Sequence, residues 1–323
     1  MLISNYLTVL ITTVGERHKY LKRLFTHYQG LNCRKIVIDS SDFPYSEIDN
    51  FPEIEYYQEP RMELYEKYLK GLQLVNTEFI LVAADDDFAV IKGVEQALDF
   101  LISNPDYSFA NGQQLRFYED NPRTVNSYGV WQYNKQLKDN FYSNDPVKRV
   151  NYMFETFMPP NYSVMKTNVL LNAVQLVLEN PHLKPVKYFD KILGFVAAVE
   201  GNFKMLPILL LLRSNGERLM RTSANSFSEP EVSFDSIIER LVNNYDPLSE
   251  KLAKASEISM EQAQSVTLEA LQRWIQISPV GKKRTLLEKI SKKVRQKLSS
   301  SLAESKEYKD EVEKILNLVR THN

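Results

Sequence analysis

The most constraining feature of the chain is the apolar run Phe79–Ala84, which is followed at once by Asp85, Asp86 and Asp87. Six apolar residues with aromatic and β-branched members are typical of a strand buried on both faces of a parallel sheet. In open α/β sheets, ligands bind at the carboxyl ends of such strands. Three carboxylates crowded there would repel one another without a cation, and Mg²⁺ or Mn²⁺ takes oxygen ligands and bridges to phosphates. The other interpretation is an acidic turn that caps a helix starting near Phe88.

Strand-like and helix-like segments alternate through the first 106 residues. The predicted strands are Leu7–Thr13, 35–41, 54–57 and Phe79–Ala84, and the predicted helices are 20–28, 62–75 and 90–103. Alternation of this kind predicts an α/β fold, with a parallel sheet covered by helices on both faces.

The pattern changes after residue 106. We predict short strands at 107–110 and 114–118, helices at 164–179 and 189–200, and a strand from 203 or 204 to 212. Segment 119–160 is polar, aromatic and poorly periodic, as in a binding loop or lid. Beyond residue 230 the pattern is helical, with a break at Gly281. We therefore divide the chain into one domain at 1–228, made of a nucleotide-binding half (1–106) and an acceptor half (107–228), and a C-terminal helical region (229–323).

Composition narrows the class of protein. A net charge of −1 gives no reason to expect nucleic acid as a partner. The single cysteine, Cys33, excludes an intrachain disulfide and a cysteine-based zinc site, and it fits a reducing cytoplasm. The four histidines are scattered and form no metal-binding spacing. Residues 1–5 lack the basic start of a secretory signal, and 206–212 is too short to span a membrane, so we expect a cytoplasmic protein.

Polar side chains follow three of the predicted strands. Thr12, Val14 and Arg17 lie at the end of the first strand, Asp39 ends the second, and the Asp triplet follows the fourth. In a parallel sheet these groups meet at one edge, where a nucleotide would bind. Asp39 could accept a hydrogen bond from a base imide or a ribose hydroxyl, or could form an Asx-turn. Arg17 could contact a phosphate, or could face solvent on the first helical turn.

Three stretches together resemble a known family. They are LTVLITTVGERHKYLKRLF (7–25), IVIDSS (36–41) and TEFILVAADDDF (77–88). They resemble nucleotide-sugar-dependent glycosyltransferases of the GT-A fold, closest to the family-2-like group and a bacterial subgroup of it, over about residues 5–220. The resemblance implies a Rossmann-like, mostly parallel sheet. It also implies a metal-dependent, hexosyltransferase-like enzyme of polysaccharide biosynthesis, which moves a sugar from a nucleotide-diphosphate-sugar donor to a glycan or lipid-linked glycan hydroxyl.

The resemblance also assigns roles to the acidic residues. In that family a DxD motif binds the donor diphosphate through Mg²⁺ or Mn²⁺, and its last carboxylate ligates the ion. By this likeness Asp87 is the metal ligand, and Asp85 and Asp86 contact the sugar or ribose. Asp39 matches the position that typically reads the nucleobase.

The family's catalytic base is an acid at the start of a helix in the acceptor half, and residues 188–207 resemble that stretch. Asp190 is therefore the candidate base for inverting transfer, although the family's usual pair of adjacent acids is reduced here to one. The other interpretation of Asp190 is the N-cap of a 190–200 helix. The family often places a His or a basic residue after the next strand to close over the diphosphate. Arg213 and Arg218 match that place, and solvation of an ordinary loop is the alternative.

A basic amphipathic segment lies near the C-terminus. Residues 282–298 carry eight Lys or Arg against the single acid Glu288, with apolar residues at helical spacing. Such a helix can bind an anionic membrane surface, here the inner face of the cell membrane. It can equally pack on the enzyme itself or on a second subunit of a homo-oligomer.

Three other functions compete with the glycosyltransferase. A sugar nucleotidyltransferase has a related sheet but expects a glycine-rich loop after the first strand, and 14–17 holds only Gly15. A phosphatase with an Asp nucleophile would usually place its Asp-x-Asp after the first strand instead of the fourth. A non-catalytic binding module that kept the GT-A fold would carry the same sequence pattern.

Overall fold

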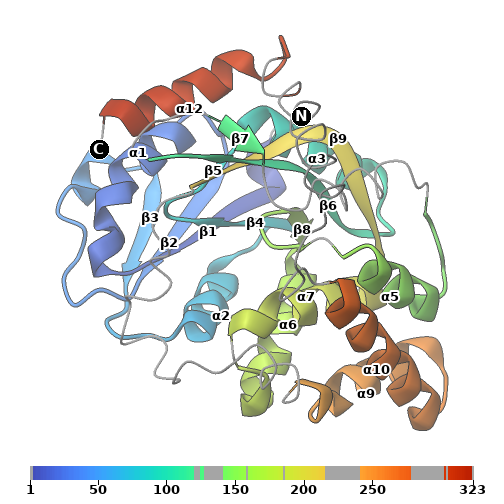
Figure 1. The fold of residues 1–323 in the computed structure, drawn as a ribbon. Coiled ribbons are helices and arrows are strands. Elements are labelled where there is room, and N and C mark those ends of the chain that lie inside the picture. The colour runs from blue at the N-terminus through green and yellow to red at the C-terminus, as the bar shows by residue number, and fades with distance from the viewer. Residues whose placement is uncertain are drawn as a thin grey trace, which may run out of the picture.

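The computed structural model describes residues 3–119, 124–126, 141–157, 159–184, 186–214, 241–277, 302 and 305–321. Within them, nine strands form one mixed sheet with helices on both faces, which confirms the α/β class (Figure 1). The strand order is β3-β2-β1-β4-β8-β6-β9-β5, and β7 pairs with β6. The strands are β1 (Leu7–Thr13), β2 (Arg34–Asp39), β3 (Ile54–Gln58), β4 (Phe79–Ala84), β5 (Phe88–Ala89), β6 (Tyr107–Phe117), β7 (Thr124–Asn126), β8 (Val164–Lys166) and β9 (Asn202–Ser214).

The first four strands along one side of the sheet are parallel. β1 pairs with β2 and with β4, and β2 pairs with β3, all in parallel register. β8 is antiparallel to both of its neighbours, β4 and β6, and β9 runs parallel to β6. The carboxyl ends of β1, β2, β4, β6 and β9 therefore all lie at one edge of the sheet, which we call the carboxyl edge.

Each parallel strand divides its side chains between two cores. In β1, Val9 and Ile11 join one buried cluster and Leu10 joins the other. Successive side chains of a strand point to opposite faces, so a strand between two helical layers must be apolar on both. This is why the continuous apolar runs of the sequence became central strands.

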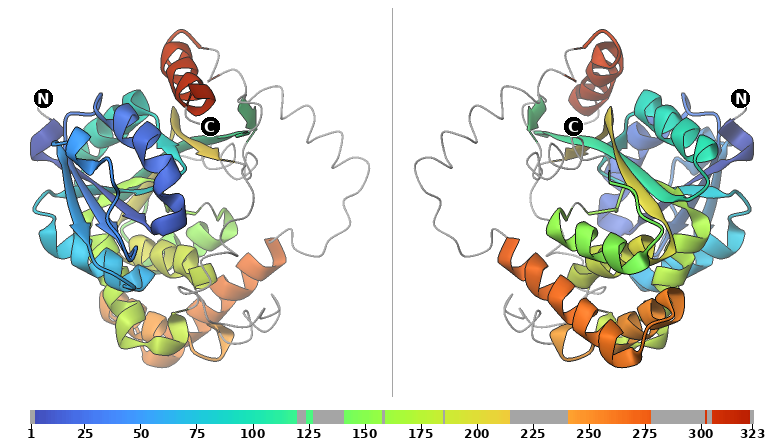
Figure 2. Two further views of the ribbon diagram at one scale, coloured as in Figure 1. Left: turned by 90° about the vertical axis from the view of Figure 1, so that its left-hand side faces the viewer. Right: turned by 90° about the vertical axis from the view of Figure 1, so that its right-hand side faces the viewer.

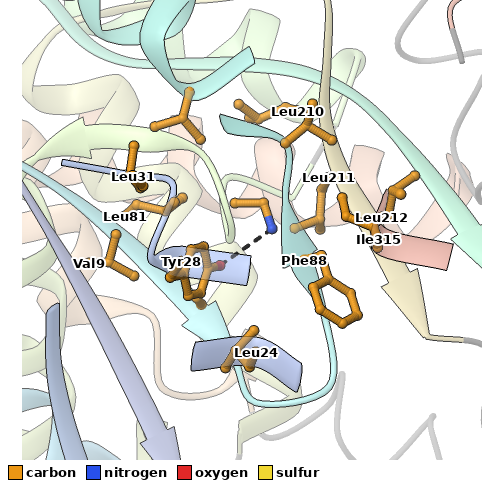
Figure 3. Close-up of a cluster of buried hydrophobic side chains, with 14 of the residues drawn as sticks. Val9, Leu24, Tyr28, Leu31, Leu81, Phe88, Leu210, Leu211, Leu212 and Ile315 are labelled. Carbon is orange, nitrogen blue, oxygen red and sulfur yellow. Dashed lines mark hydrogen bonds between the residues drawn. The ribbon is translucent and has the colours of Figure 1, made fainter. Parts of the chain in front are cut away.

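One face of the sheet is covered by α1 (His18–Tyr28), α3 (Ile91–Ser103) and the C-terminal helix α12 (Lys309–Thr321). Figure 3 shows side chains of this core, including Leu24 of α1, Leu81 of β4 and Ile315 of α12. The Tyr28 hydroxyl is buried among them and accepts a hydrogen bond of 3.3 Å from the Ala89 backbone N–H. On this face, α1 from the start of the chain and α12 from its end pack into the same core.

The docking of α12 also involves a helix cap. The carboxylate of Glu311 accepts hydrogen bonds from the backbone N–H groups of Ile91 and Lys92, the latter at 3.2 Å. A carboxylate there satisfies backbone donors that the first turn of α3 leaves unpaired. In the same helix, a Cβ added to Gly93 would come within 2.0 Å of the Leu209 carbonyl oxygen, so only glycine allows α3 to pack this closely on β9.

The opposite face of the sheet carries the remaining longer helices: α2 (Leu64–Leu74), α5 (Pro146–Glu155), α6 (Thr167–Glu179), α7 (Val186–Glu200), α9 (Asp246–Ser256) and α10 (Met260–Ile277). Helices α9 and α10 pack on α5 and α7, and α12 lies on the far side of the sheet from them (Figure 2). None of the described helices combines the length and the apolarity that a bilayer span requires.

The structure corrects four of the predicted elements. The two strands predicted at 107–110 and 114–118 are one strand, β6, because irregular pairing around Gly112 interrupts its pattern without ending it. Residues 164–166, predicted as helix, form β8 between β4 and β6. The segment predicted as a loop at 119–160 contains α5. The alternative interpretation of the Asp triplet placed a helix start near Phe88, but Phe88 lies in β5 and α3 begins at Ile91.

Candidate functional site

The sheet register brings the predicted strand-end residues together. Thr13 of β1 is the register partner of Asp39 in β2, and Thr12 is the partner of Ala84 in β4. The Asp triplet therefore leaves the sheet beside the end of β1 and the loop that follows it. Thr12 lies at this junction and hydrogen-bonds to the Tyr68 hydroxyl, and Val14 begins the loop in extended conformation.

Arg17 holds the first two carboxylates of the triplet. Its Nε donates to Asp85 Oδ1 at 2.6 Å, and its Nη2 lies 2.8 Å from Asp86 Oδ1 and also contacts Asp85. Thr13 Oγ1 donates to Asp85 Oδ2 at 2.7 Å. Asp85 is only 2% exposed, so burial raises its pKa, and Arg17 opposes that rise. Arg17 therefore offsets part of the negative charge at this edge. It is paired with carboxylates, so the alternative interpretation, in which Arg17 faces bulk solvent, is wrong.

Asp39 has a complete set of hydrogen bonds inside the protein. His18 Nε2 lies 2.6 Å from Oδ2, the Tyr56 hydroxyl also donates to Oδ2, and the Ser41 backbone and hydroxyl donate to Oδ1. Burial alone would raise the pKa of Asp39, but the bonds from His18, Ser41 and Tyr56 bring it below its ordinary value. The bond from Ser41 N is the Asx-turn that the sequence analysis considered. Because Asp39 is 0% exposed, a nucleobase could reach its carboxylate only by displacing one of these partners.

A buried lysine connects the ends of β1 and β2. Lys67 of α2 donates to the Thr13 carbonyl at 3.0 Å and to Ser40 Oγ at 2.9 Å. Burial lowers its pKa to about 8, while Asp85 and Asp39 oppose the shift. Its ammonium group adds positive charge beneath the carboxyl edge.

The last carboxylate of the triplet faces the end of β9. Asp87 Oδ1 accepts a 2.8 Å hydrogen bond from the Ser214 backbone N–H, and Arg213 Nε lies 3.3 Å from Oδ2. Burial and the charge of Asp86 raise the pKa of Asp87 to about 7, against the opposing effect of Arg213. Negative charge is thus in excess where Asp86 and Asp87 meet.

A buried ion pair anchors this end of β9. Arg23, which is 0% exposed, donates two hydrogen bonds of 2.7 Å to the carboxylate of Glu119. The Ser214 hydroxyl donates to the same carboxylate at 2.6 Å. Since the Ser214 backbone N–H binds Asp87, Glu119 links α1 to the position of the triplet's last carboxylate.

Asp190 lies across the site from the triplet, on α7. Its Oδ1 accepts a hydrogen bond from Asn161 Nδ2, and Lys191 Nζ lies 3.9 Å from its Oδ2. The carboxylates of Asp190, Asp87 and Asp86 all act electrostatically on Arg213, so the two ends of the site are neighbours. Because α7 begins at Val186, Asp190 lies inside the helix and is not its N-cap.

The donor set of the carboxyl edge fits a hard divalent cation. Asp86 and Asp87 supply carboxylate oxygens close enough for the charge of Asp86 to act on Asp87, and the Asp86 side chain is 26% exposed. Within the described residues, no three His, Cys, Asp or Glu side chains form a ligand cluster. A Mg²⁺ ion that used Asp86 and Asp87 would therefore need waters and substrate phosphates as its remaining ligands.

The structure thus brings most of the predicted site residues to one place. Those found at the carboxyl edge or facing it across the site are Thr12, Val14, Arg17, Asp39, Asp85, Asp86, Asp87, Asp190 and Arg213. Arg218 and the basic segment 282–298 lie outside the described residues. Their roles stay predictions.

Sequence analysis did not find several side chains of the site. These are His18, Lys67, Glu119, Asn161 and Tyr162. His18 directly follows Arg17 and is the first residue of α1, and its place next to Arg17 was a usable signal. The others are single polar residues within helices, strand ends or turns, where the sequence carries no periodic signal.

Comparison with known proteins supports the fold. No family model matches the chain, and no curated protein sequence matches it. Among solved structures, TarS of S. aureus aligns with a TM-score of 0.56 and 13% identity over 88% of this chain, which spans 46% of TarS. TarS 1–349 in complex with UDP-GlcNAc aligns with a TM-score of 0.56 and 13% identity, over 98% of this chain and 88% of that one. TarS 1–349 in complex with UDP aligns with a TM-score of 0.55 and 14% identity, over 98% of this chain and 90% of that one. These likenesses confirm the predicted GT-A-like fold.

Proposed function

We propose that this chain is a glycosyltransferase that uses a nucleotide-diphosphate-sugar donor. The observation that carries the proposal is the arrangement of Arg17, Asp85–Asp87 and Arg213 at the carboxyl edge of the sheet. Two arginines there flank three consecutive acidic residues, Arg17 beside Asp85 and Asp86 and Arg213 beside Asp87. That pattern suits a diphosphate whose charge is shared between arginines and a bound cation. TarS, a glycosyltransferase of the same fold, binds UDP-GlcNAc and UDP, which makes UDP-sugars the first donors to test.

In this proposal Asp87, with Asp86 beside it, holds Mg²⁺ or Mn²⁺. The ion would neutralise the leaving diphosphate, as metal ions do in phosphoryl chemistry. The residues of the chain do the remaining work. Arg213 and Arg17 place positive charge at both ends of the triplet, and the buried Asp85 keeps the Arg17 guanidinium in a fixed orientation. Arg218 stays a candidate for the same task.

Asp190 is the proposed base. The acceptor hydroxyl oxygen attacks the anomeric carbon while the bond from that carbon to the diphosphate oxygen breaks. The diphosphate leaves with the bonding electrons, the hydroxyl proton passes to Asp190, and attack from the opposite side inverts the anomeric centre. Asn161 fixes one oxygen of the carboxylate, and Lys191 stabilises its charge. Asp39 would contribute at the nucleobase end of the donor, through its hydrogen bonds with His18 and Tyr56.

The acceptor is proposed to be a hydroxyl of a glycan or of a lipid-linked glycan. Tyr65 and Tyr68 of α2 lie near Asp190, and within the described residues the Tyr65 hydroxyl has no hydrogen-bond partner. A tyrosine ring whose hydroxyl lacks a partner, as in Tyr65, suits contact with a sugar. Cytoplasmic location, contact of 282–298 with the membrane surface and a homo-oligomer remain part of the proposal.

Donor turnover tests this function. Wild-type protein with Mn²⁺ would be screened against UDP-, GDP- and dTDP-sugars for release of the nucleoside diphosphate, with Asp190→Asn and the exposed-acid control Asp310→Asn alongside. We expect Asp190→Asn to lower turnover by about 10²- to 10⁴-fold while binding the donor, since a positioned base contributes about that much. Turnover equal to wild type would remove Asp190 as base. Donor binding without turnover of any donor would favour a non-catalytic module.

A further inference from the structure

The turn at residues 160–163 contains the most unusual backbone of the site. Tyr162 has φ of 66°, in the left-handed region that a bulky side chain rarely adopts. Two other described non-glycine residues have positive φ, Arg61 and Glu257, and both are exposed. Glu257 follows the end of α9, where such a conformation is common. Tyr162 is instead packed within the candidate site, where strain points to function.

The surrounding structure fixes this turn. Ser163 N–H donates to the Pro160 carbonyl at 3.1 Å, and the Ser163 hydroxyl donates to the same oxygen at 2.5 Å. Residue 164 then enters β8, which is antiparallel to β4, so the turn lies toward the carboxyl end of β4. It therefore sits beside the place where the Asp triplet begins.

Two neighbouring side chains of the turn reach the two ends of the site. Asn161 donates a hydrogen bond to Oδ1 of Asp190, the proposed catalytic base at one end of the site. The Tyr162 ring lies under Arg213, whose guanidinium carbon is 4.9 Å from the ring centroid. The same Arg213 approaches Asp87 at 3.3 Å. The turn thus connects the base to the diphosphate end through adjacent residues.

We infer that Tyr162 is a positioning residue, whose strained backbone places its ring under Arg213 and so holds that guanidinium against the diphosphate end of the site. The inference rests on the proposed function. An aromatic face attracts a guanidinium and restricts its orientation, most strongly where water is excluded. The left-handed backbone at 162 would by itself favour Gly or Asn. The need for an aromatic ring under Arg213 explains why a tyrosine stands there instead.

The test uses substitutions that separate the ring from the strain. Tyr162→Asn removes the ring and suits the left-handed backbone, Tyr162→Phe keeps the ring, and Glu257→Asn relaxes a similar backbone far from the site. Binding of UDP in the presence of Mn²⁺ would be measured by calorimetry, together with the melting temperature. We expect Tyr162→Asn to weaken UDP binding by about 5- to 30-fold, the range of a desolvated cation–π contact. Its melting temperature reflects the lost packing of the ring and the relieved backbone strain, which act in opposite directions.

The controls make the outcome specific. Tyr162→Phe should bind UDP within about two-fold of wild type, and Glu257→Asn should not change binding. If Tyr162 acts through Arg213, Tyr162→Asn should weaken UDP binding no further once Arg213→Ala is present. Wild-type affinity in Tyr162→Asn, or additive losses in the double variant, would each overturn the inference while leaving the proposed function in place.

Failure of the function itself would look different. A wild-type protein that binds no UDP or other nucleoside diphosphate would contradict the proposed function, and with it a role of Tyr162 toward a diphosphate. The energetic coupling between Tyr162 and Arg213 would then be measured from melting temperatures alone. The four proteins are wild type, Tyr162→Asn, Arg213→Ala and the double variant. Shifts that fail to add confirm the coupling of Tyr162 and Arg213, and additive shifts exclude it.

Discussion

Replacing Arg17 by methionine should expose how strongly the carboxyl edge depends on positive charge. Methionine keeps much of the side chain's volume and removes the guanidinium that contacts Asp85 and Asp86. Asp85, at 2% exposure, would retain the hydrogen bond from Thr13 but lose its counter-ion. Removing one partner of a buried ion pair typically costs about 3–5 kcal/mol.

Two features of the structure reduce that figure. Arg17 keeps 21% of its side chain exposed, so solvent already screens part of the pair. Asp85 can also take up a proton. From an ordinary carboxyl pKa of 3.8 this costs at most about 4 kcal/mol at pH 7. We therefore expect Arg17→Met to lower the free energy of unfolding by about 2–4 kcal/mol.

The pH dependence of the loss has a definite sign. In Arg17→Met the folded protein binds a proton at Asp85 that the unfolded chain releases above its pKa of 3.8, so the variant loses stability as pH rises from 4 toward 7. The difference from wild type should accordingly shrink to about 1–2 kcal/mol at pH 5. Urea unfolding in EDTA, followed by circular dichroism at both pH values, measures this directly.

Matched variants decide whether the reasoning holds. Arg34→Met breaks a bidentate pair with Glu55 that is equally short, at 2.7–2.8 Å, but 30–37% exposed, and should cost less than about 1 kcal/mol. Adding Asp85→Asn to Arg17→Met should recover most of the loss, because the stranded charge is gone. Equal costs for Arg17→Met and Arg34→Met, or no recovery in the double variant, would refute the account.

Three further predictions follow from single groups. Because burial and Asp86 raise the pKa of Asp87 to about 7, and a metal ligand must be deprotonated, Mn²⁺-dependent UDP affinity should rise between pH 6 and pH 8 by calorimetry; a flat profile would exclude Asp87 as ligand. Burial lowers the pKa of Lys67 to about 8, so the folded state releases a proton that the unfolded chain keeps, and wild-type stability should gain about 1–2 kcal/mol relative to Lys67→Met between pH 8 and pH 9.5; parallel curves would contradict this. Gly93→Ala should lower stability by at least about 1–3 kcal/mol, because its Cβ would meet the Leu209 carbonyl at 2.0 Å; an unchanged urea midpoint would show that α3 can move.

The sequence predicts the parallel part of this fold well. Strands β1 and β4 have the predicted bounds, because both are apolar runs with polar residues at their ends. The carboxyl edge follows from the order of those strands, and Arg17 and the Asp triplet lie on it. Prediction was weaker where pairing was irregular, as in β6, or where a strand was as short as β8.

The electrostatic partners of the site could not be read from the sequence. Tyr56 reaches Asp39 only because β3 pairs with β2, and Lys67 reaches Thr13 from 54 positions away. The sequence around Tyr162 does not indicate that the tyrosine, and not the neighbouring Asn161, adopts the left-handed backbone. Such features depend on tertiary contacts, which override local preference.

The most direct test of the central claim is calorimetric titration of UDP with Mn²⁺ into wild type, Asp87→Asn and the exposed control Asp99→Asn. The account predicts that wild type and Asp99→Asn bind alike, and that Asp87→Asn loses the Mn²⁺-dependent part of the affinity. Binding by Asp87→Asn that matches wild type, with and without Mn²⁺, would contradict it.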